Sequence, residues 1–370
     1  MSKIFLFLSS IALLCCTSNN KSADTLVQTG TMPDSESGYN LGVSACYAAT
    51  YNGTMLLTGG CNFPEKPAAE GGAKRYYKGI YTASTEDITK WRMIGELPEP
   101  SAYGVPLKYG ESLIIVGGIN SDGANKNVYM LTPEGDNCGI KQLPPLPCTI
   151  DNAAGAISGN RIYIVGGNAD GKASTRFFTL DIVAPSHGWM ELENFPGRGR
   201  VQPVCAATSK ALYLWGGFSP CDSTSEAAVH CDGAKYDFAT QKWSTLPMVT
   251  DENGEPLTLS GGTATTIDDK KIIAAGGVNR EIFKDAISDK YTLIAKEEYM
   301  RQPAEWYKFN DRMLAFDTEK EEWRVIIQNR TFARAGAILT TDAKYIYYVG
   351  GELKPGIRTP EIKEFSFLIK

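Results

Sequence analysis

Short runs of apolar residues, each ending in a pair of glycines, recur along the chain. Six are present, at 55–60, 113–118, 162–167, 211–217, 271–277 and 345–351. Their second glycines lie 58, 49, 50, 60 and 74 residues apart. A short apolar run bounded by glycine predicts a buried β-strand that ends in a sharp turn. The recurrence of this strand indicates repeated β units along the chain.

The residues around each run complete a unit of four strands. An apolar segment with small side chains precedes the run, as at 153–157 and 204–208, and an aromatic segment with Asp follows it, as at Tyr236-Asp237. Four units then carry a tryptophan: Trp91, Trp189, Trp243 and Trp323. Most units close with an apolar residue before proline, as at Leu97-Pro98 and Leu246-Pro247. This order resembles the Kelch repeat and predicts an all-β fold, a six-bladed Kelch-type β-propeller.

The two ends of the chain complete the count of strands. Segment 363–368 resembles the third strand of a blade, but no fourth strand follows it. Segment 25–33 ends in Met32-Pro33, which copies the close of a fourth strand. We therefore expect segment 25–33 to pair beside segment 363–368 and to close the ring of a single domain at 25–370. Closure in this way removes two free sheet edges.

The first 16 residues have the features of an export signal. Lys3 precedes an apolar run at 4–14 that is too short to span a bilayer. Leu13 lies three residues before Cys16, as in bacterial lipoprotein signals, although Cys15 stands where a smaller residue is usual. We predict lipidation at Cys16, a flexible tether at 17–24, and a periplasmic or membrane-anchored protein. Cleavage nearby with plain secretion is the alternative.

Charge and composition narrow the range of partners. The 37 Lys and Arg residues against 42 Asp and Glu give a net charge of −5, so a nucleic-acid partner has little electrostatic support. The only histidines are His187 and His230, too few for multi-His metal chemistry, and we expect neither metal nor cofactor.

Seven cysteines follow the signal. Two pairs close short loops and are candidate disulfides in a periplasm: Cys138 with Cys148, and Cys221 with Cys231.

Two of the loops after the glycine pairs stand out. Because strands in a meander alternate in direction, these loops and the ones after the apolar-proline pairs share one face, around the mouth of the central channel. The first loop is 351–359, and the second is 277–283, which opens a charged, helix-prone insertion at about 281–311. The insertion forms either a lid over the mouth or a surface decoration.

The loop Gly351-Glu352-Leu353-Lys354-Pro355-Gly356-Ile357-Arg358-Thr359 resembles the most distinctive stretch of the sialic acid (N-acetylneuraminate) mutarotase or epimerase family. Segments 276–283, 102–118 and 196–202 are also similar to family segments. The resemblance covers nearly the whole chain after the signal. In the usual family order the segments that resemble residues 26–130 come last, whereas here they come first. The chain therefore resembles a cyclically permuted member of the family.

This resemblance implies interconversion of the α and β anomers of N-acetylneuraminate by acid/base-assisted ring opening. The family's proposed active-site pair, a Glu and an Arg six residues apart, matches Glu352 and Arg358. One carboxylate near water can take the anomeric proton and return a proton to the ring oxygen, and an Arg fork can hold the substrate carboxylate. The expected partner is a small acidic sugar, with Glu352 catalytic and Arg358 substrate-binding. Taken without the resemblance, the same two residues suit a surface ion pair beside a Pro-Gly turn.

Other residues and other functions complete the set of hypotheses. Five further residues on the same face are candidates for substrate binding: Arg200, Arg334, Tyr103, Asn279 and Asn62. The two asparagines also suit plain turns.

The main alternative function is a non-catalytic Kelch propeller that binds a glycan or a protein. A copper radical oxidase is disfavoured because His187 and His230 fall in peripheral segments of the blades. The Ser-x-Asp-x-Gly-x-x-Trp boxes of sialidases are absent.

Overall fold

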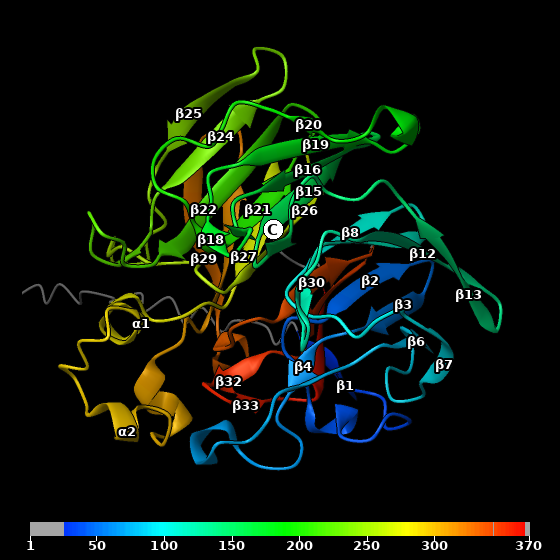
Figure 1. Ribbon diagram of the computed structural model, residues 1–370, viewed down its shortest axis with the longest axis horizontal. Coiled ribbons are helices and arrows are strands. Elements are labelled where there is room, and N and C mark those ends of the chain that lie inside the picture. Colours follow the sequence, from blue (N-terminus) through cyan, green and yellow to red (C-terminus); the bar gives the residue numbers. More distant parts are fainter. Residues whose placement is uncertain (1–25, 343, 367–370) are drawn as a thin grey trace, which may run out of the picture.

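Six antiparallel sheets of four main strands surround a central channel in the computed structural model, which describes residues 26–342 and 344–366 (Figure 1). The innermost strand of each sheet contacts those of both neighbouring sheets, and the contacts close into a ring. In order around the channel these strands are β2 (Tyr47–Tyr51), β8 (Val105–Tyr109), β15 (Ala154–Ser158), β21 (Val201–Ala207), β26 (Thr263–Asp268) and β30 (Ile338–Thr341). The predicted all-β, six-bladed propeller is confirmed.

The remaining main strands follow outward in each blade. Blade 1 adds β3 (Thr54–Thr58), β6 (Gly79–Ser84) and β7 (Arg92–Glu96), and blade 2 adds β9 (Ser112–Val116), β12 (Val128–Glu134) and β13 (Asn137–Gln142). Blade 3 adds β16 (Arg161–Val165), β19 (Phe177–Asp181) and β20 (Met190–Glu191), and blade 4 adds β22 (Ala211–Ser219), β24 (Gly233–Asp237) and β25 (Lys242–Leu246). Blade 5 adds β27 (Lys271–Ala275), β28 (Arg312–Asp317) and β29 (Glu322–Gln328), and blade 6 adds β31 (Tyr345–Val349), β34 (Glu361–Ser366) and β1 (Leu26–Thr31).

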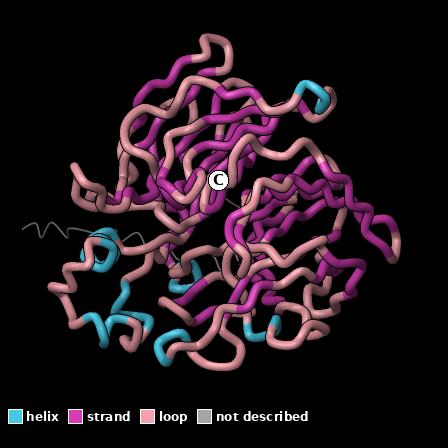
Figure 2. The backbone as a smooth tube through the Cα atoms, in the orientation of Figure 1, coloured by secondary structure: helices cyan, strands magenta, loops and turns pink. Residues whose placement is uncertain are grey.

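Short strands decorate the loops between these main strands. They are β4 (Cys61–Asn62), β5 (Arg75–Tyr76), β10 (Ile119–Asn120), β11 (Gly123–Ala124), β14 (Ile150–Asp151), β17 (Asn168–Ala169), β18 (Lys172–Ala173), β23 (Ala228–Val229), β32 (Glu352–Lys354) and β33 (Ile357–Arg358). Helices are few and lie at the periphery of the view (Figure 2). They are η1 (Tyr39–Leu41), η2 (Ala68–Glu70), η3 (Pro185–His187), α1 (Arg280–Ile287), α2 (Lys296–Tyr299), η4 (Ala304–Tyr307) and η5 (Arg330–Phe332).

The N-terminal strand closes the ring in the way that the sequence predicts. β1 is the outermost strand of blade 6 and pairs antiparallel with β34, with Thr29 opposite Lys363 and Gly30 opposite Ile362. Strands from the two ends of the chain thus share one sheet. This pairing gives β34 a partner on both sides and ties the first described residues to the last.

The glycine pairs dock each blade onto the next one. All twelve of these glycines have positive φ, between 56° and 118°, a region that side chains disfavour. In five blades the N–H of the second glycine donates to a carbonyl at the start of the following blade. These bonds run from Gly60 to Ser101, Gly118 to Ile150, Gly167 to Arg200, Gly277 to Arg334 and Gly351 to Val43. The loops after the glycine pairs and the segments before the inner strands therefore lie on one face, as predicted.

A belt of six residues encircles the channel mouth, and five of them lie two residues beyond one of those carbonyls. Its members are Ala45, Tyr103, Asn152, Gln202, Gly261 and Gly336, one from each blade. Each member donates its N–H to the carbonyl of the preceding one at 2.7–3.2 Å, and Ala45 donates to Gly336, so the bonds form a closed cycle. All six have φ between 52° and 69°. Four of the six carry a side chain in this left-handed conformation, which is a strained arrangement that the surrounding ring must enforce.

Aromatic side chains join neighbouring blades farther out. The indole N–H of Trp91 donates to the Thr31 carbonyl, that of Trp189 to Pro144, and that of Trp243 to Glu193. In each case the acceptor belongs to the preceding blade, so the tryptophans hold the blades together, as the repeat pattern indicates.

Other predictions meet different outcomes. Segment 1–24, with Cys16, lies outside the described residues, so the signal and the lipid anchor stay predictions. No helix in the described ranges is long and apolar enough to cross a membrane. The seven cysteines that the structure describes are all free thiols, including the two candidate pairs at 138/148 and 221/231.

Candidate functional site

Glu352 and Arg358 face each other across a tight hairpin at the channel mouth. The hairpin consists of β32 and β33, which pair Glu352 directly opposite Arg358. Pro355 and Gly356 form its turn, and Gly356 has φ 85°. Arg358 Nη1 lies 3.1 Å from Glu352 Oε1, and the Gly356 N–H donates to the same oxygen at 2.8 Å. The turn therefore brings the two side chains together and fixes one carboxylate oxygen.

The backbone of blade 6 holds this hairpin against the belt. Glu352 and Ala335 exchange two backbone hydrogen bonds, at 2.7 and 3.0 Å. Ala335 immediately precedes the belt residue Gly336. Since the belt has no free edge, it gives the carboxylate a rigid support.

Arg358 lies behind Glu352 in a nearly closed environment. Its side chain is only 4% exposed, compared with 24% for Glu352. Its Nε donates to Ser44 Oγ at 3.2 Å, and its guanidinium lies 4.8 Å from the centre of the Phe63 ring. Nη1 approaches Glu352 without the alignment of a hydrogen bond and has no other acceptor among the described residues. A buried guanidinium with an unused donor has capacity for a further anion.

Glu352 borders a cavity of about 180 Å³ that lies against the mouth of the central channel. The channel itself encloses about 540 Å³, lined by the inner strands of all six blades. The two spaces share the belt residues Tyr103, Gln202 and Gly336. Arg358 does not line the smaller cavity, and of the hairpin only Glu352 and Pro355 do.

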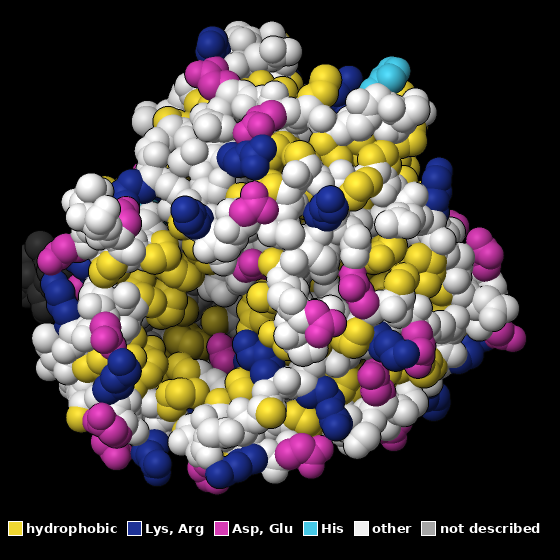
Figure 3. Space-filling view, viewed as in Figure 1, with side chains coloured by type: hydrophobic (Ala, Val, Ile, Leu, Met, Phe, Trp, Pro, Cys, Tyr) yellow, Lys and Arg dark blue, Asp and Glu magenta, His cyan; other side chains and the backbone are white. Residues whose placement is uncertain are grey.

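The cavity has one polar half and one apolar half. Ser44, Tyr103, Gln202, Asn279 and Glu352 supply its polar groups. Its other half consists of large apolar side chains from β22 and the insertion: Phe218, Val278, Ile282, Phe283, Tyr299, Tyr307 and Phe309. The space-filling view shows the hollow beside the insertion, bordered mainly by hydrophobic side chains, with an acidic and a basic group on one side (Figure 3). Such a site suits a small molecule with one charged end.

Two phenols at this site remain protonated at neutral pH. Burial raises the pKa of Tyr103 well above its usual value, and the Glu352 carboxylate raises it further. Burial also raises the pKa of Tyr307 to about 12. Lys74 lies on the rim, with its ammonium 5.1 Å from the centre of the Tyr103 ring. The Tyr307 hydroxyl already donates to the Tyr299 carbonyl, so Tyr103 is the phenol of this pair that can donate to a polar ligand.

The structure does not bring Arg200 or Arg334 to the cavity. Arg200 donates to the carbonyls of Gly216 and Asp232 and to the Asp232 carboxylate, at 2.7–3.3 Å. Arg334 makes the corresponding bonds to Gly350 and Glu361, at 2.9–3.1 Å. Both side chains are at most 5% exposed. These arginines clamp a glycine pair to the strand that follows it, and they belong to the architecture of their blades.

The two asparagines have different positions. Asn62 is buried, donates to the carbonyls of Gly38 and Gly42, and accepts from the Tyr77 hydroxyl, each at 2.8 Å. Its hydrogen bonds are thus filled within blade 1. Asn279 lines the cavity and caps α1, where its Oδ1 accepts from two backbone N–H groups at 3.1 Å. Among the predicted residues, the structure therefore gathers Glu352, Tyr103 and Asn279 around one cavity, with Arg358 behind it.

Several residues at the site escape prediction from the sequence. Gln202 donates its amide N–H to Asn152 Oδ1 at 2.9 Å, so two neighbouring belt residues are joined by their side chains. The aromatic residues of the apolar half come from separate segments between 218 and 309. In the sequence, Ser44 has no distinguishing feature except that it directly precedes the belt residue Ala45. The one pattern that could have located the belt residues is their regular position near the start of each blade's first strand.

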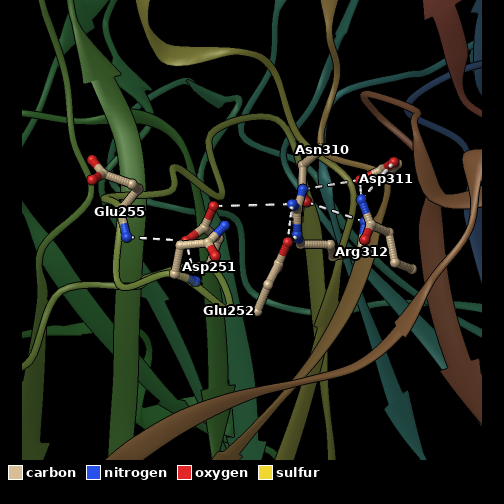
Figure 4. A network of polar contacts seen from close by, with 8 residues as sticks. Asp251, Glu252, Glu255, Asn310, Asp311 and Arg312 are labelled. Atoms are coloured by element: carbon tan, nitrogen blue, oxygen red, sulfur yellow. Dashed lines mark hydrogen bonds and ion pairs between the residues drawn. The ribbon is translucent and has the colours of Figure 1, made fainter. Parts of the chain in front are cut away.

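A second polar cluster lies on the outer side of the insertion (Figure 4). Arg312 binds Glu252 through two bonds of 2.8 Å and Asp311 at 3.0 Å, and Glu255 N–H donates to Asp251. The Arg312 guanidinium lowers the pKa of Glu252 to about 2. This cluster borders a wider cavity of about 660 Å³, and its one arginine lies within 4.0 Å of three carboxylates, those of Asp251, Glu252 and Asp311. It ties the end of the insertion to the connection between blades 4 and 5.

Metal binding has no support in the described ranges. No group of three or more His, Cys, Asp or Glu side chains there is placed to hold a metal ion.

The chain is similar to known proteins of one family. The sequence model of the N-acetylneuraminate epimerase family matches residues 16–140 and 143–369. A relative named N-acetylneuraminate epimerase from Haemophilus influenzae (strain PittEE) is 32% identical over 242 residues, which cover 63% of this chain and 62% of that protein. One of the same name from Vibrio vulnificus (strain YJ016) is 25% identical over 239 residues, 60% of this chain and 59% of that protein.

A solved structure of YjhT is similar in fold. It shows a TM-score of 0.54 and 30% sequence identity, and the match covers 62% of this chain and 66% of that one. The chain thus spans about three fifths of the length of the curated relatives that it matches. The cyclic permutation stays a prediction, since none of these matches gives the order of segments. The family match, by contrast, extends over most of the chain, and the chain belongs to the N-acetylneuraminate epimerase family.

Proposed function

We propose that the protein is a mutarotase that speeds the interconversion of the α and β anomers of N-acetylneuraminate. The observation that carries the proposal is the Glu352–Arg358 hairpin, which presents a partly exposed carboxylate to the cavity and a buried cation behind it. Membership of the epimerase family supports the same activity.

Glu352 acts as the acid/base in this proposal. Its carboxylate takes the proton of the anomeric hydroxyl while the bond from C2 to the ring oxygen breaks, and water at the mouth protonates that oxygen. The open-chain ketone rotates and recloses from its other face, and the proton transfers run in reverse. General acid–base assistance of this kind typically contributes 10²–10⁴-fold in rate. No cofactor is needed, because no electrons leave the substrate.

Arg358 supplies the positive charge for the substrate carboxylate. Its Nη1 has a donor without an aligned acceptor. A substrate carboxylate beside Glu352 would share this guanidinium, with Arg358 acting from behind the cavity wall.

The test is the rate of anomer conversion followed by NMR on freshly released α-N-acetylneuraminate. We expect the purified protein to raise the rate above the spontaneous rate at the same pH, in proportion to its concentration. An unchanged rate would overturn the proposal. If the sugar still bound saturably, the non-catalytic propeller would replace the mutarotase as the best account.

A further inference from the structure

The apolar half of the cavity contains more aromatic surface than a sugar ring requires. We define the aromatic wall as Phe218, Phe283, Tyr299, Tyr307 and Phe309, all of which line the cavity that Glu352 borders. Only Tyr307 is buried, and the other four are intermediate in exposure. Large aromatic side chains that remain partly exposed in a concave site mark a surface for an apolar group of a ligand.

Several contacts hold the aromatic wall in place without a ligand. Phe218, in β22, and Phe283, in α1, meet edge to face with centroids 5.1 Å apart. The Tyr307 hydroxyl donates to the carbonyl of Tyr299. Lys354 Nζ, on the Glu352 hairpin, donates to the Gln302 carbonyl of the insertion at 2.6 Å. The insertion is thus tied both to blade 4 and to the catalytic hairpin, so the wall is preorganised.

The position of the wall relative to Glu352 matches the layout of the substrate. Phe218 belongs to blade 4, whereas Glu352 belongs to blade 6, so the cavity extends from one to the other. In N-acetylneuraminate the carboxylate is on C2 and the acetamido group is on C5, at opposite corners of the six-membered ring. A substrate held by its carboxylate near Arg358 therefore directs its acetamido group away from the hairpin.

We propose that the aromatic wall, which includes Phe283, binds the methyl of the C5 acylamino group and makes the enzyme selective for 5-acylamino sugar acids over their 5-hydroxy counterparts. This rests on the proposed function and adds its substrate selectivity. The acyl methyl is the one apolar substituent of the sugar, and the remaining substituents are hydroxyls and a carboxylate. Burying a methyl group against apolar surface is favourable, whereas a hydroxyl gains nothing there without a hydrogen-bond partner.

The experiment compares two acids with three proteins. The acids are N-acetylneuraminate and the same nine-carbon acid with a hydroxyl in place of the acetamido group. The proteins are the full chain, Phe283→Ala, and Ile287→Ala as a matched control. Ile287 lies on the same helix and has the same intermediate exposure, but it does not line the cavity. Both the anomer-conversion rate and the binding constant are measured for each pair.

We expect the wild type to favour the acetamido acid about 10-fold in kcat/KM and in binding, the usual scale for an apolar pocket. Phe283→Ala should remove that preference and leave the 5-hydroxy acid unaffected, whereas Ile287→Ala should retain it. Saturation transfer from the protein should be strongest at the acetyl methyl. The inference would be overturned if the wild type had the same kcat/KM and affinity for both acids. It would also be overturned if Phe283→Ala reduced these values equally for both acids. If neither acid is converted, the mutarotase proposal fails, and the binding preference alone then supports or overturns the role of the wall.

Discussion

Blade 6 contains two arginine–glutamate pairs whose surroundings differ. Arg334 and Arg358 are both almost fully buried, with side chains 1% and 4% exposed, and each pairs with a glutamate. Arg334 fills its two Nη groups with two carbonyls and the Glu361 carboxylate. Arg358 makes one hydrogen bond, to Ser44, and its Nη1 is left without an aligned acceptor. Among the described residues Arg334 leaves its Nε without a partner, whereas Arg358 leaves Nη1, the atom that lies next to Glu352.

The fourth blade shows which of these pairs belongs to the fold. Arg200 makes the same contacts to Gly216 and Asp232 that Arg334 makes to Gly350 and Glu361. A contact set that recurs at the same place in two blades is part of the repeat. Two-stranded hairpins also follow the glycine pairs of blades 1, 2 and 3, but among the described residues only the hairpin of blade 6 carries a Glu opposite an Arg. Burial and ion pairing therefore do not separate the proposed site pair from the clamps, whereas the place of Glu352 on the cavity does.

The largest expected effect is on stability, when either clamp is removed. Arg334→Ala or Arg200→Ala should lower the free energy of unfolding by about 2–4 kcal/mol, because carbonyls of the glycine loop lose their donors and a carboxylate loses its buried partner. Denaturant unfolding measures this loss. Arg161→Ala breaks an exposed pair with Asp181 and serves as the control, with an expected change of about 0–1 kcal/mol. Clamp variants that unfold like the Arg161 variant would show that the clamps are not structural.

Replacement of Arg358 should affect binding instead. Arg358→Lys keeps the charge but loses the planar fork, and it should weaken the binding of N-acetylneuraminate by about 1–3 kcal/mol. Calorimetric titration at fixed salt gives the constant. The matched variant Arg334→Lys should reduce stability and leave the affinity of the folded protein unchanged. Equal affinities for wild type and Arg358→Lys would remove Arg358 from the substrate site.

A smaller effect should separate the two clamps by pH. His230 lies beside the Arg200 clamp, and burial, with the nearby Arg200 charge, lowers its pKa to about 4. The unfolded chain, with a His pKa near 6.5, binds more protons between these values, so the stability due to neutral His230 is present above about pH 6.5 and is lost as pH falls toward 4. The expected loss is about 1–3 kcal/mol at pH 4.

The variant His230→Gln tests this dependence. It keeps a donor for Ser219, which lies 2.8 Å from His230 Nε2, and it should flatten the stability profile between pH 6.5 and 4. His187→Gln, at an exposed position in η3, is the control and should leave the profile unchanged. A profile that stays equally steep in His230→Gln would assign the acid sensitivity to other groups.

The features of the fold that repeat could be predicted from the sequence. Six glycine pairs at similar spacing predict six blades, and Met32-Pro33 predicts the closing strand, because both patterns mark strand ends. The nearness of Glu352 and Arg358 also follows from the sequence, since Pro355 and Gly356 between them require a turn. These predictions succeed because each depends on residues that are close together in the chain.

The residues that depend on long-range packing could not be predicted. Arg200 and Arg334 lie on the correct face, but a position on a face does not give the direction of a side chain, and both turn into their own blades. The belt imposes the left-handed backbone conformation at Tyr103 and Gln202. Since neither residue is a glycine, the sequence does not indicate this conformation. The aromatic wall joins segments that are up to 91 residues apart, from Phe218 to Phe309, and only the folded ring brings them together.

The measurement that tests the central claim most directly is the catalysed rate of α-to-β conversion by Glu352→Gln beside Glu361→Gln. Glu352→Gln keeps the size of the side chain and removes its titratable group, so the rate should fall by about 10²-fold or more with the melting temperature unchanged. Glu361→Gln should lower the melting temperature and keep the rate per folded molecule. A folded Glu352→Gln protein that converts the sugar at the wild-type rate would contradict the account.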